Sequence, residues 1–147
     1  MAKEVFKAKV SWDKKSVACT AEARGMHVKI DEPESLGGTD TGMNPVELLL
    51  SALGGCVTIS LLVFAPKFDV NIQDCYVTLE GDLDPDGFLG KNPAVRKGFS
   101  HIRFTIHLKT DSPRENVQKL YDHFEKNCPV ADTLQGVPIS GVYQLNS

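Results

Sequence analysis

Four cysteines carry the reactive chemistry that this sequence can support: Cys19, Cys56, Cys75 and Cys128. Cys56 follows a glycine pair inside an apolar run, and Cys128 stands directly before Pro129. A helix that starts at this proline would favour a thiolate at Cys128, because its first N–H groups are unpaired. If Cys56 and Cys128 meet in space, peroxide can oxidise one sulfur to a sulfenic acid and the other can close a disulfide.

Each cysteine also has a purely structural interpretation. Cys19 and Cys75 alternate with apolar neighbours, which predicts small buried side chains in strands. Cys56 in mid-helix gains nothing from the helix dipole, so a thiolate there needs a cation or a donor from elsewhere. Cys128 could be a helix-end residue shielded by Pro129. A separation of 72 positions between Cys56 and Cys128 does not decide between packing and catalysis.

Composition argues against several other classes of protein. The chain has 147 residues, 16 basic and 19 acidic, and a formal net charge of −3, so nucleic acid is not an expected partner. There is no Cys-x-x-Cys, and the four histidines lie far from any cysteine pair in sequence, so we expect no metal and no cofactor. Few cysteines and no signal-peptide pattern predict a reducing, cytoplasmic location.

The segment Leu48–Ala65 has 18 residues without a charge and must form the central element. Asn44 can cap a helix, Pro45 suits its first position, Glu47 completes a capping box, and Pro66 ends the run. The length also meets the lower limit for a membrane span. Two glycines and four polar or thiol groups inside the run favour instead the buried centre of a globular protein or dimer.

The elements around this helix predict one α+β domain over 1–147, divided into 1–43, 44–65 and 66–147. Strands are expected at Val5–Trp12, Ser16–Glu22, Met26–Ile30, Val70–Glu80, Ser100–Lys109 and Val137–Leu145. Residues 31–43 and 81–99 lack a hydrophobic period and predict loops. A second helix, capped by Ser112, must break at Cys128, and a short helix can follow from Pro129 to Leu134.

These motifs together resemble a known superfamily. The segment Leu36-Gly37-Gly38, the run from Asn44-Pro45 to Gly54-Gly55-Cys56, and Cys128-Pro129-Val130 are similar to the osmotically inducible protein C (OsmC) and organic hydroperoxide resistance protein (Ohr) superfamily. The order of strands, long helix, strands, helix and final strand agrees over nearly the whole chain.

The resemblance implies an intertwined α+β homodimer with antiparallel sheets around long buried central helices. It also implies a thiol peroxidase for oxidative-stress defence, in which Cys56 attacks an organic hydroperoxide and releases the alcohol. Cys56 sulfenic acid is then resolved by Cys128, and a dithiol reduces the disulfide. The resemblance implies no metal or haem, and neither nucleic acid nor a membrane as a partner.

The sequence departs from the characterised peroxidases at the glutamate that follows the proline of the long helix. Val46 stands at that position, and glutamate comes one residue later at Glu47. Nine positions at about 100° each place Glu47 and Cys56 about 180° apart on one helix. Glu47 is therefore expected to act only in the capping box or to act across a dimer.

The second departure concerns the family's arginine near the N-terminus. That position falls near Lys14 and Lys15, and the nearest arginine is Arg24. Lysine lacks the bidentate fork of arginine, so Lys15 and Arg24 are candidate supporting residues beside Glu47. These departures resemble a less characterised branch and keep a second function open. In that alternative the protein is a non-catalytic module that binds a small apolar or thiol ligand at the dimer interface.

Overall fold

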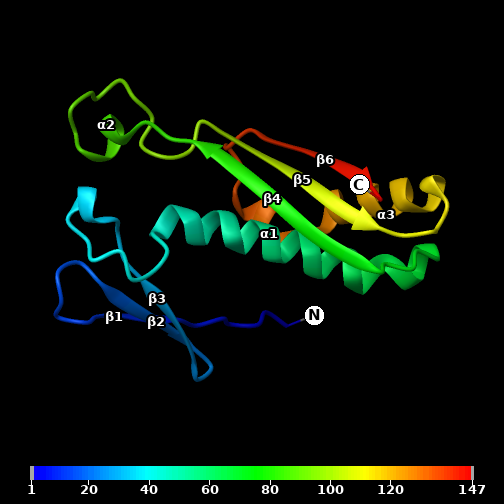
Figure 1. Cartoon of the computed structure of the whole chain (residues 1–147), viewed down its shortest axis with the longest axis horizontal. Helices are drawn as coiled ribbons and strands as arrows, with labels where there is room; N and C mark the ends of the chain where they lie inside the picture. The colour runs from blue at the N-terminus through cyan, green and yellow to red at the C-terminus, as the bar shows by residue number, and fades with distance from the viewer. Residues whose placement is uncertain (1, 147) are drawn as a thin grey trace. The chain divides into compact units, whose positions relative to one another are not determined.

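The computed structural model describes residues 2–146, and these fall into two compact units, one up to Leu49 and one from Leu50 onward. The first unit contains β1 (Lys9–Trp12), β2 (Cys19–Ala23), β3 (Met26–Ile30) and the 3-10 helix η1 (Glu34–Leu36). The second contains η2 (Ala65–Phe68), β4 (Asp74–Asp82), α2 (Pro85–Phe88), β5 (His101–Lys109), α3 (Arg114–Asn127), α4 (Pro129–Thr133) and β6 (Ile139–Leu145). Helix α1 (Pro45–Phe64) begins in the first unit (Figure 1).

The first unit is built on an antiparallel meander, as its alternating sequence predicts. Strand β2 lies between β1 and β3, with Val10 opposite Ala21 and Ala21 opposite Val28. Strand β1 starts at Lys9, so the expected strand at residues 5–8 does not form. Directly paired residues point to the same face, which gives this sheet one apolar face. Trp12 and Met26 on that face are largely exposed, at 62% and 54%.

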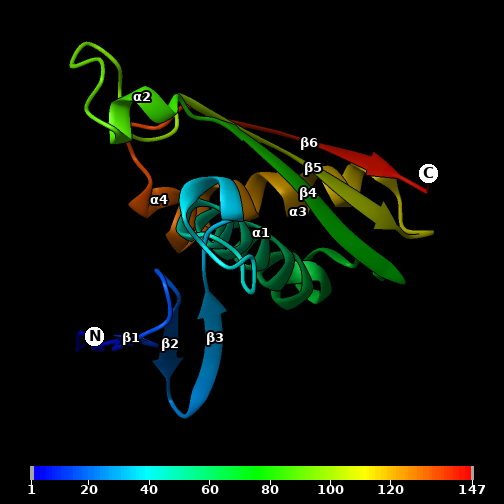
Figure 2. The same ribbon diagram turned by 60° about the vertical axis from the view of Figure 1, so that its left-hand side comes forward.

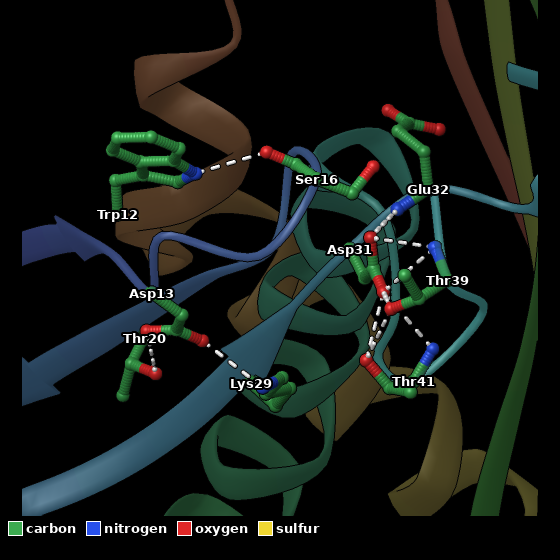
Figure 3. Close-up of polar contacts among 9 residues, drawn as sticks. All are labelled: Trp12, Asp13, Ser16, Thr20, Lys29, Asp31, Glu32, Thr39 and Thr41. Atoms are coloured by element: carbon green, nitrogen blue, oxygen red, sulfur yellow. Dashed lines mark hydrogen bonds and ion pairs between the residues drawn. The ribbon is translucent and has the colours of Figure 1, made fainter. Parts of the chain in front are cut away.

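The loop after β3 is held in shape by one buried carboxylate, Asp31 (Figure 3). Its oxygens accept hydrogen bonds from the backbone N–H groups of Glu32, Thr39 and Thr41 and from both threonine hydroxyls. The threonine bonds above all hold the pKa of Asp31 far below its ordinary value. Asp31 thus fixes the segment that leads to α1, a role that the sequence pattern did not reveal.

The start of α1 confirms the predicted capping box. The Asn44 side chain accepts a hydrogen bond from the Glu47 N–H, and the Glu47 carboxylate accepts one from the Asn44 N–H, each at 2.9 Å. Pro45 is the first residue of the helix. The α-helical part ends at Phe64, and a 3-10 turn carries the chain across Pro66.

The second unit is a three-stranded sheet covered on one face by helices (Figures 1 and 2). Strand β5 is central, and its inward side chains Ile102, Phe104, Ile106 and Leu108 are buried as the alternation predicts. Helix α3 packs on them, and the rings of Phe104 and Phe124 lie 6.2 Å apart. Helix α1 lies on the same face of the sheet and contacts α3 through Phe64 and His123 at 4.4 Å.

Three details of this unit differ from expectation. Strand β6 is parallel to β5, so the sheet is mixed and not antiparallel throughout. The connection through α3 and α4 supplies the long crossover that a parallel pair requires. Ser112 does not cap α3, because its hydroxyl accepts a hydrogen bond from the Asn71 N–H, and Pro113 takes the cap position. The 81–99 loop contains one helical turn, α2.

Helix α1 is buried on one face and exposed on the other. Leu53, Val57 and Leu61 are almost completely buried, whereas Ile59 and Val63 are 63% and 64% exposed. The stretch Pro45–Phe68 is also the one helical segment among residues 2–146 that is long and apolar enough to cross a membrane. The buried stripe of Leu53, Val57 and Leu61 shows that this face of α1 belongs to the hydrophobic core.

Candidate functional site

Cys56 is positioned by a close contact between α1 and β4. A Cβ atom added at Gly54 would lie 2.7 Å from Cδ1 of Leu79, so glycine allows the helix to approach this strand. The cost of glycine in a helix, about 1 kcal/mol relative to alanine, is offset at this position by that approach. Gly55 has open space around its Cα within the described residues. Cys56 itself is half-buried, on the turn that this contact fixes.

Cys128 is positioned by the corner between α3 and α4. Helix α3 ends at Asn127 because Pro129 excludes the α conformation from the residue before it, and Cys128 is extended, with φ −80° and ψ 110°. Pro129 then starts α4, and the Asp132 N–H donates to the Cys128 carbonyl. The break and the short helix were both predicted. Cys128 is only 2% exposed.

The fold brings the two predicted thiols into direct contact. The Cys128 S–H donates a hydrogen bond to the Cys56 sulfur, and the two sulfur atoms are 2.9 Å apart. A disulfide needs about 2.05 Å, so the sulfurs would have to approach by less than about 1 Å. Both cysteines are free thiols in this structure.

The protonation of Cys128 differs from the sequence-based expectation. Burial first, and the bond to Cys56 second, raise the pKa of the Cys128 thiol. Backbone hydrogen bonds at Ala131 and Val130 lower it, as a helix start should, but they are outweighed. The prediction that α4 makes Cys128 the thiolate is therefore wrong: Cys128 is the protonated donor, and Cys56 is the acceptor.

A cavity of about 390 Å³, with Cys128 among its lining residues, lies within the second unit. Apolar side chains contribute to its wall, among them Leu53, Phe124, Leu134 and Val137. Glu125 and Gln135 add two polar groups. Sequence reasoning missed this cavity, because the residues that line it come from five elements and loops and share no pattern.

The other cysteines occupy strands, as predicted, but neither is completely buried. Cys19 starts β2 and Cys75 lies in β4, and both are of intermediate exposure. Burial first, and the neighbouring Asp74 second, raise the pKa of Cys75, which disfavours its thiolate. Among residues 2–146, no three His, Cys, Asp or Glu side chains are grouped so as to hold a metal ion.

The three candidate supporting residues all belong to the first unit. Glu47 takes part in the capping box of α1. Lys15 lies in the β1–β2 turn, where its carbonyl accepts from the Ala18 N–H, and Arg24 lies in the β2–β3 turn with a positive φ of 52°. Their roles toward Cys56 stay predictions.

Known proteins resemble this chain in sequence and in fold. An uncharacterized protein of Bacillus subtilis (strain 168), YmaD, is 26% identical over 145 residues, which cover 92% of this chain and 90% of the relative. Among solved structures, an OsmC-like protein from Mycoplasma pneumoniae has a TM-score of 0.84 at 20% identity and covers 98% of this chain and 99% of its own.

An organic hydroperoxide resistance protein OsmC from Legionella pneumophila, described as a predicted redox protein, has a TM-score of 0.68 at 18% identity. The match covers 98% of this chain and 99% of that one. At these identities the structures establish the fold alone. The family described as OsmC-like protein matches residues 38–140, which include both Cys56 and Cys128. This chain therefore belongs to the OsmC-like protein family.

Proposed function

We propose that this protein is a thiol-dependent peroxidase that reduces organic hydroperoxides in the cytoplasm as a defence against oxidative stress. Cys56 is the attacking thiol and Cys128 the resolving thiol. Family membership and the contact between the two sulfurs support this proposal. The observation that supports the proposal most strongly is the hydrogen bond from Cys128 to Cys56. This bond places a protonated thiol directly beside the sulfur that would be oxidised.

The chemistry balances with these two residues and no cofactor. The Cys56 thiolate attacks the terminal peroxide oxygen, the O–O bond breaks, and the alkoxide leaves and takes up a proton as the alcohol. Cys56 becomes a sulfenic acid. The Cys128 sulfur then attacks the Cys56 sulfur, and the hydroxyl leaves with the Cys128 proton as water. A dithiol returns the disulfide to two thiols.

The cavity beside Cys128 supports an organic substrate over hydrogen peroxide. A volume of about 390 Å³ with apolar side chains in its wall can hold an alkyl or aryl group. Burial of such a group is favourable by about 0.8 kcal/mol for each CH₂. Hydrogen peroxide has no group that could gain from this wall.

The same cavity favours a second candidate, a non-catalytic module that binds a small apolar or thiol ligand. The arginine of the family's site would fall near Lys14 and Lys15, and lysine lacks the bidentate fork that arginine offers to a peroxide. Binding of such a ligand would not need a nucleophile at position 56. A Cys56→Ser variant separates the two functions, because it removes catalysis and leaves the cavity in place.

A homodimer is part of the proposal, and two unpartnered apolar surfaces support it. One is the sheet face of the first unit that carries Val10, Trp12 and Met26. The other is the stripe on α1 formed by Ala52, Gly55, Ile59, Leu62 and Val63. Exposure of this much apolar surface is unusual for a monomer, and a second copy of the chain can cover it.

Turnover with dithiothreitol as reductant tests the catalytic proposal. We expect cumene hydroperoxide to be consumed at least about tenfold faster than hydrogen peroxide, because apolar side chains in the cavity wall can contact its aryl group. Cys56→Ser should abolish consumption, and the matched variant Cys75→Ser should leave it unchanged. Equal consumption by Cys56→Ser and the unmodified protein would overturn the peroxidase and leave the binding module.

A further inference from the structure

Three polar side chains form a row across the second unit's sheet, on the face opposite to the buried side chains of β5. Asp82 on β4 pairs directly with His101 on β5, so both side chains point to this face. Nε2 of His101 lies 2.9 Å from the hydroxyl oxygen of Ser140 on β6. A carboxylate, an imidazole and a hydroxyl therefore follow one another across three adjacent strands, in the order that activation of a serine requires.

Arg103 keeps the carboxylate of this row ionised. Nη1 of Arg103 donates a hydrogen bond to Oδ2 of Asp82 at 2.9 Å, and Nη2 donates one to Oδ1 at 3.1 Å. These bonds above all, and the charge of His101 to a smaller extent, lower the pKa of Asp82. An ionised Asp82 stabilises the imidazolium that His101 becomes when it takes the proton of Ser140.

A cavity of about 330 Å³ includes Ser140, Arg103 and Val142 among its lining residues. Val142 is 57% exposed and offers apolar contact to a short hydrocarbon group. Arg103 has five N–H donors, and its contacts with Glu80 and Asp82 use one at Nε, one at Nη1 and two at Nη2. The second N–H on Nη1 can therefore donate to the carbonyl oxygen of a molecule bound beside Ser140.

We propose that Ser140, His101 and Asp82 form a second catalytic site, which hydrolyses small carboxylic esters independently of the two thiols. The Ser140 oxygen attacks the ester carbonyl carbon while His101 takes the hydroxyl proton, and the C–O bond to the alcohol breaks. The alcohol leaves with the proton from His101. Water then attacks the acyl-serine and gives a proton to His101. This proton returns to Ser140 as the carboxylic acid leaves.

The surroundings of Ser140 favour a neutral ester. Glu80 and Asp82 carry two negative charges against the single positive charge of Arg103, so they disfavour an anionic substrate. These two carboxylate side chains are also 70% and 56% exposed. Water screens the charges of so open a site and weakens the activation of serine. Such a site suits an ester, whose alcohol leaves readily, better than an amide.

Labelling with a fluorophosphonate tests the nucleophile. The Cys56→Ser variant is treated with the reagent and digested for peptide mass analysis, and we expect the adduct on the Ser140 peptide. His101→Gln in the same background keeps a polar side chain and removes the base. This change should slow labelling by about a hundredfold or more. Absence of an adduct at Ser140, or equal labelling with His101→Gln, would overturn the proposal.

Turnover of p-nitrophenyl butyrate supplies a second readout. Over many turnovers, in which single acylation of lysines and cysteines no longer contributes, Cys56→Ser should hydrolyse this ester and the added Ser140→Ala should remove most of the activity. The matched addition Ser11→Ala, on the exposed strand β1, should leave the rate unchanged. Equal rates for the two additions would contradict the proposal. Because these assays use Cys56→Ser, their outcome is independent of the proposed peroxidase.

Discussion

Cys128 donates its S–H to the sulfur of Cys56 across 2.9 Å, although 72 positions separate the two residues in the chain. The direction of this bond distinguishes two otherwise similar thiols. Cys128 is buried, and its pKa is raised, so it holds its proton. Cys56 is half-buried, and its sulfur accepts the hydrogen bond from Cys128. The contact therefore assigns the donor and the acceptor before any substrate is present.

Replacement of Cys128, the proposed resolving thiol, should trap the first intermediate. In Cys128→Ser, Cys56 can still attack a hydroperoxide, but the sulfur that contacts it is gone. We expect a sulfenic acid at Cys56 that dimedone labels, detected as a mass adduct on the Cys56 peptide after one equivalent of cumene hydroperoxide. Cys56→Ser is the control and should show no adduct; labelling of Cys19 or Cys75 instead would refute this assignment.

Gly141 should be intolerant of any side chain. An added Cβ would overlap the ring of Phe104, and the Gly141 carbonyl accepts a hydrogen bond from the Tyr121 hydroxyl at 2.9 Å. Gly141→Ala should destabilise the protein by about 1–3 kcal/mol through overpacking. Urea unfolding measures the change, with Ser140→Ala on the exposed side of β6 as control. An unchanged midpoint would show that the Phe104 ring moves aside freely.

Asp31 should contribute stability that is lost in acid. The pKa of folded Asp31 is far below that of the unfolded residue, about 3.9, so its contribution is complete above that pH. It diminishes as the pH falls from there toward the folded pKa. Asp31→Asn should lower the urea midpoint at pH 7. Between pH 5 and about pH 2.5 the midpoint of this variant should fall less than that of the unmodified protein.

The matched control for Asp31 is Asp40→Asn in the same loop. Asp40 is exposed and has a φ of 54°, a conformation that asparagine tolerates. The urea midpoint of Asp40→Asn should equal that of the unmodified protein at every pH. Identical pH profiles for Asp31→Asn and the unmodified protein would contradict the role given to Asp31.

Gly55 should govern association of the proposed dimer. It lies in the exposed apolar stripe of α1, and no described atom outside its immediate chain neighbours and helix backbone lies within 4 Å of an added Cβ. Gly55→Leu therefore fits a single copy, and it strengthens the helix by up to about 1 kcal/mol. In a dimer that uses this stripe, the leucine side chain should prevent the two helices from approaching closely and shift the protein toward monomer.

Sedimentation velocity measures this shift, and Gly98→Leu on the exposed 81–99 loop is the control. Gly98 also has open surroundings, with only the Arg96 side chain at 4.0 Å. A dimer that survives Gly55→Leu with unchanged affinity would exclude this stripe from the interface.

Local signals in the sequence predicted much of the fold. The capping box of Asn44 and Glu47, the end of α3 at Cys128 and the alternation in β5 depend on neighbouring residues, so each was predictable and each is confirmed. The parallel direction of β6 was missed, because alternation looks the same in both directions.

The candidate site was predictable in its residues and less so in its electrostatics. The helix start after Cys128 suggested a thiolate, but burial and the bond to Cys56, which is far away in sequence, outweigh it. The carboxylate of Asp31 was missed for a similar reason, since its partners Thr39 and Thr41 resemble ordinary loop residues. Long-range packing decides such features, and no local pattern records it.

Peptide mass mapping after a single turnover tests the central claim most directly. The reduced protein receives one equivalent of cumene hydroperoxide, is quenched with acid and alkylated, and is digested without reductant. The account predicts a Cys56–Cys128 linked peptide pair, formed faster than with hydrogen peroxide, with Cys19 and Cys75 alkylated. Cys56 and Cys128 both alkylated as free thiols, while Cys19 or Cys75 is oxidised at a similar rate, would contradict it.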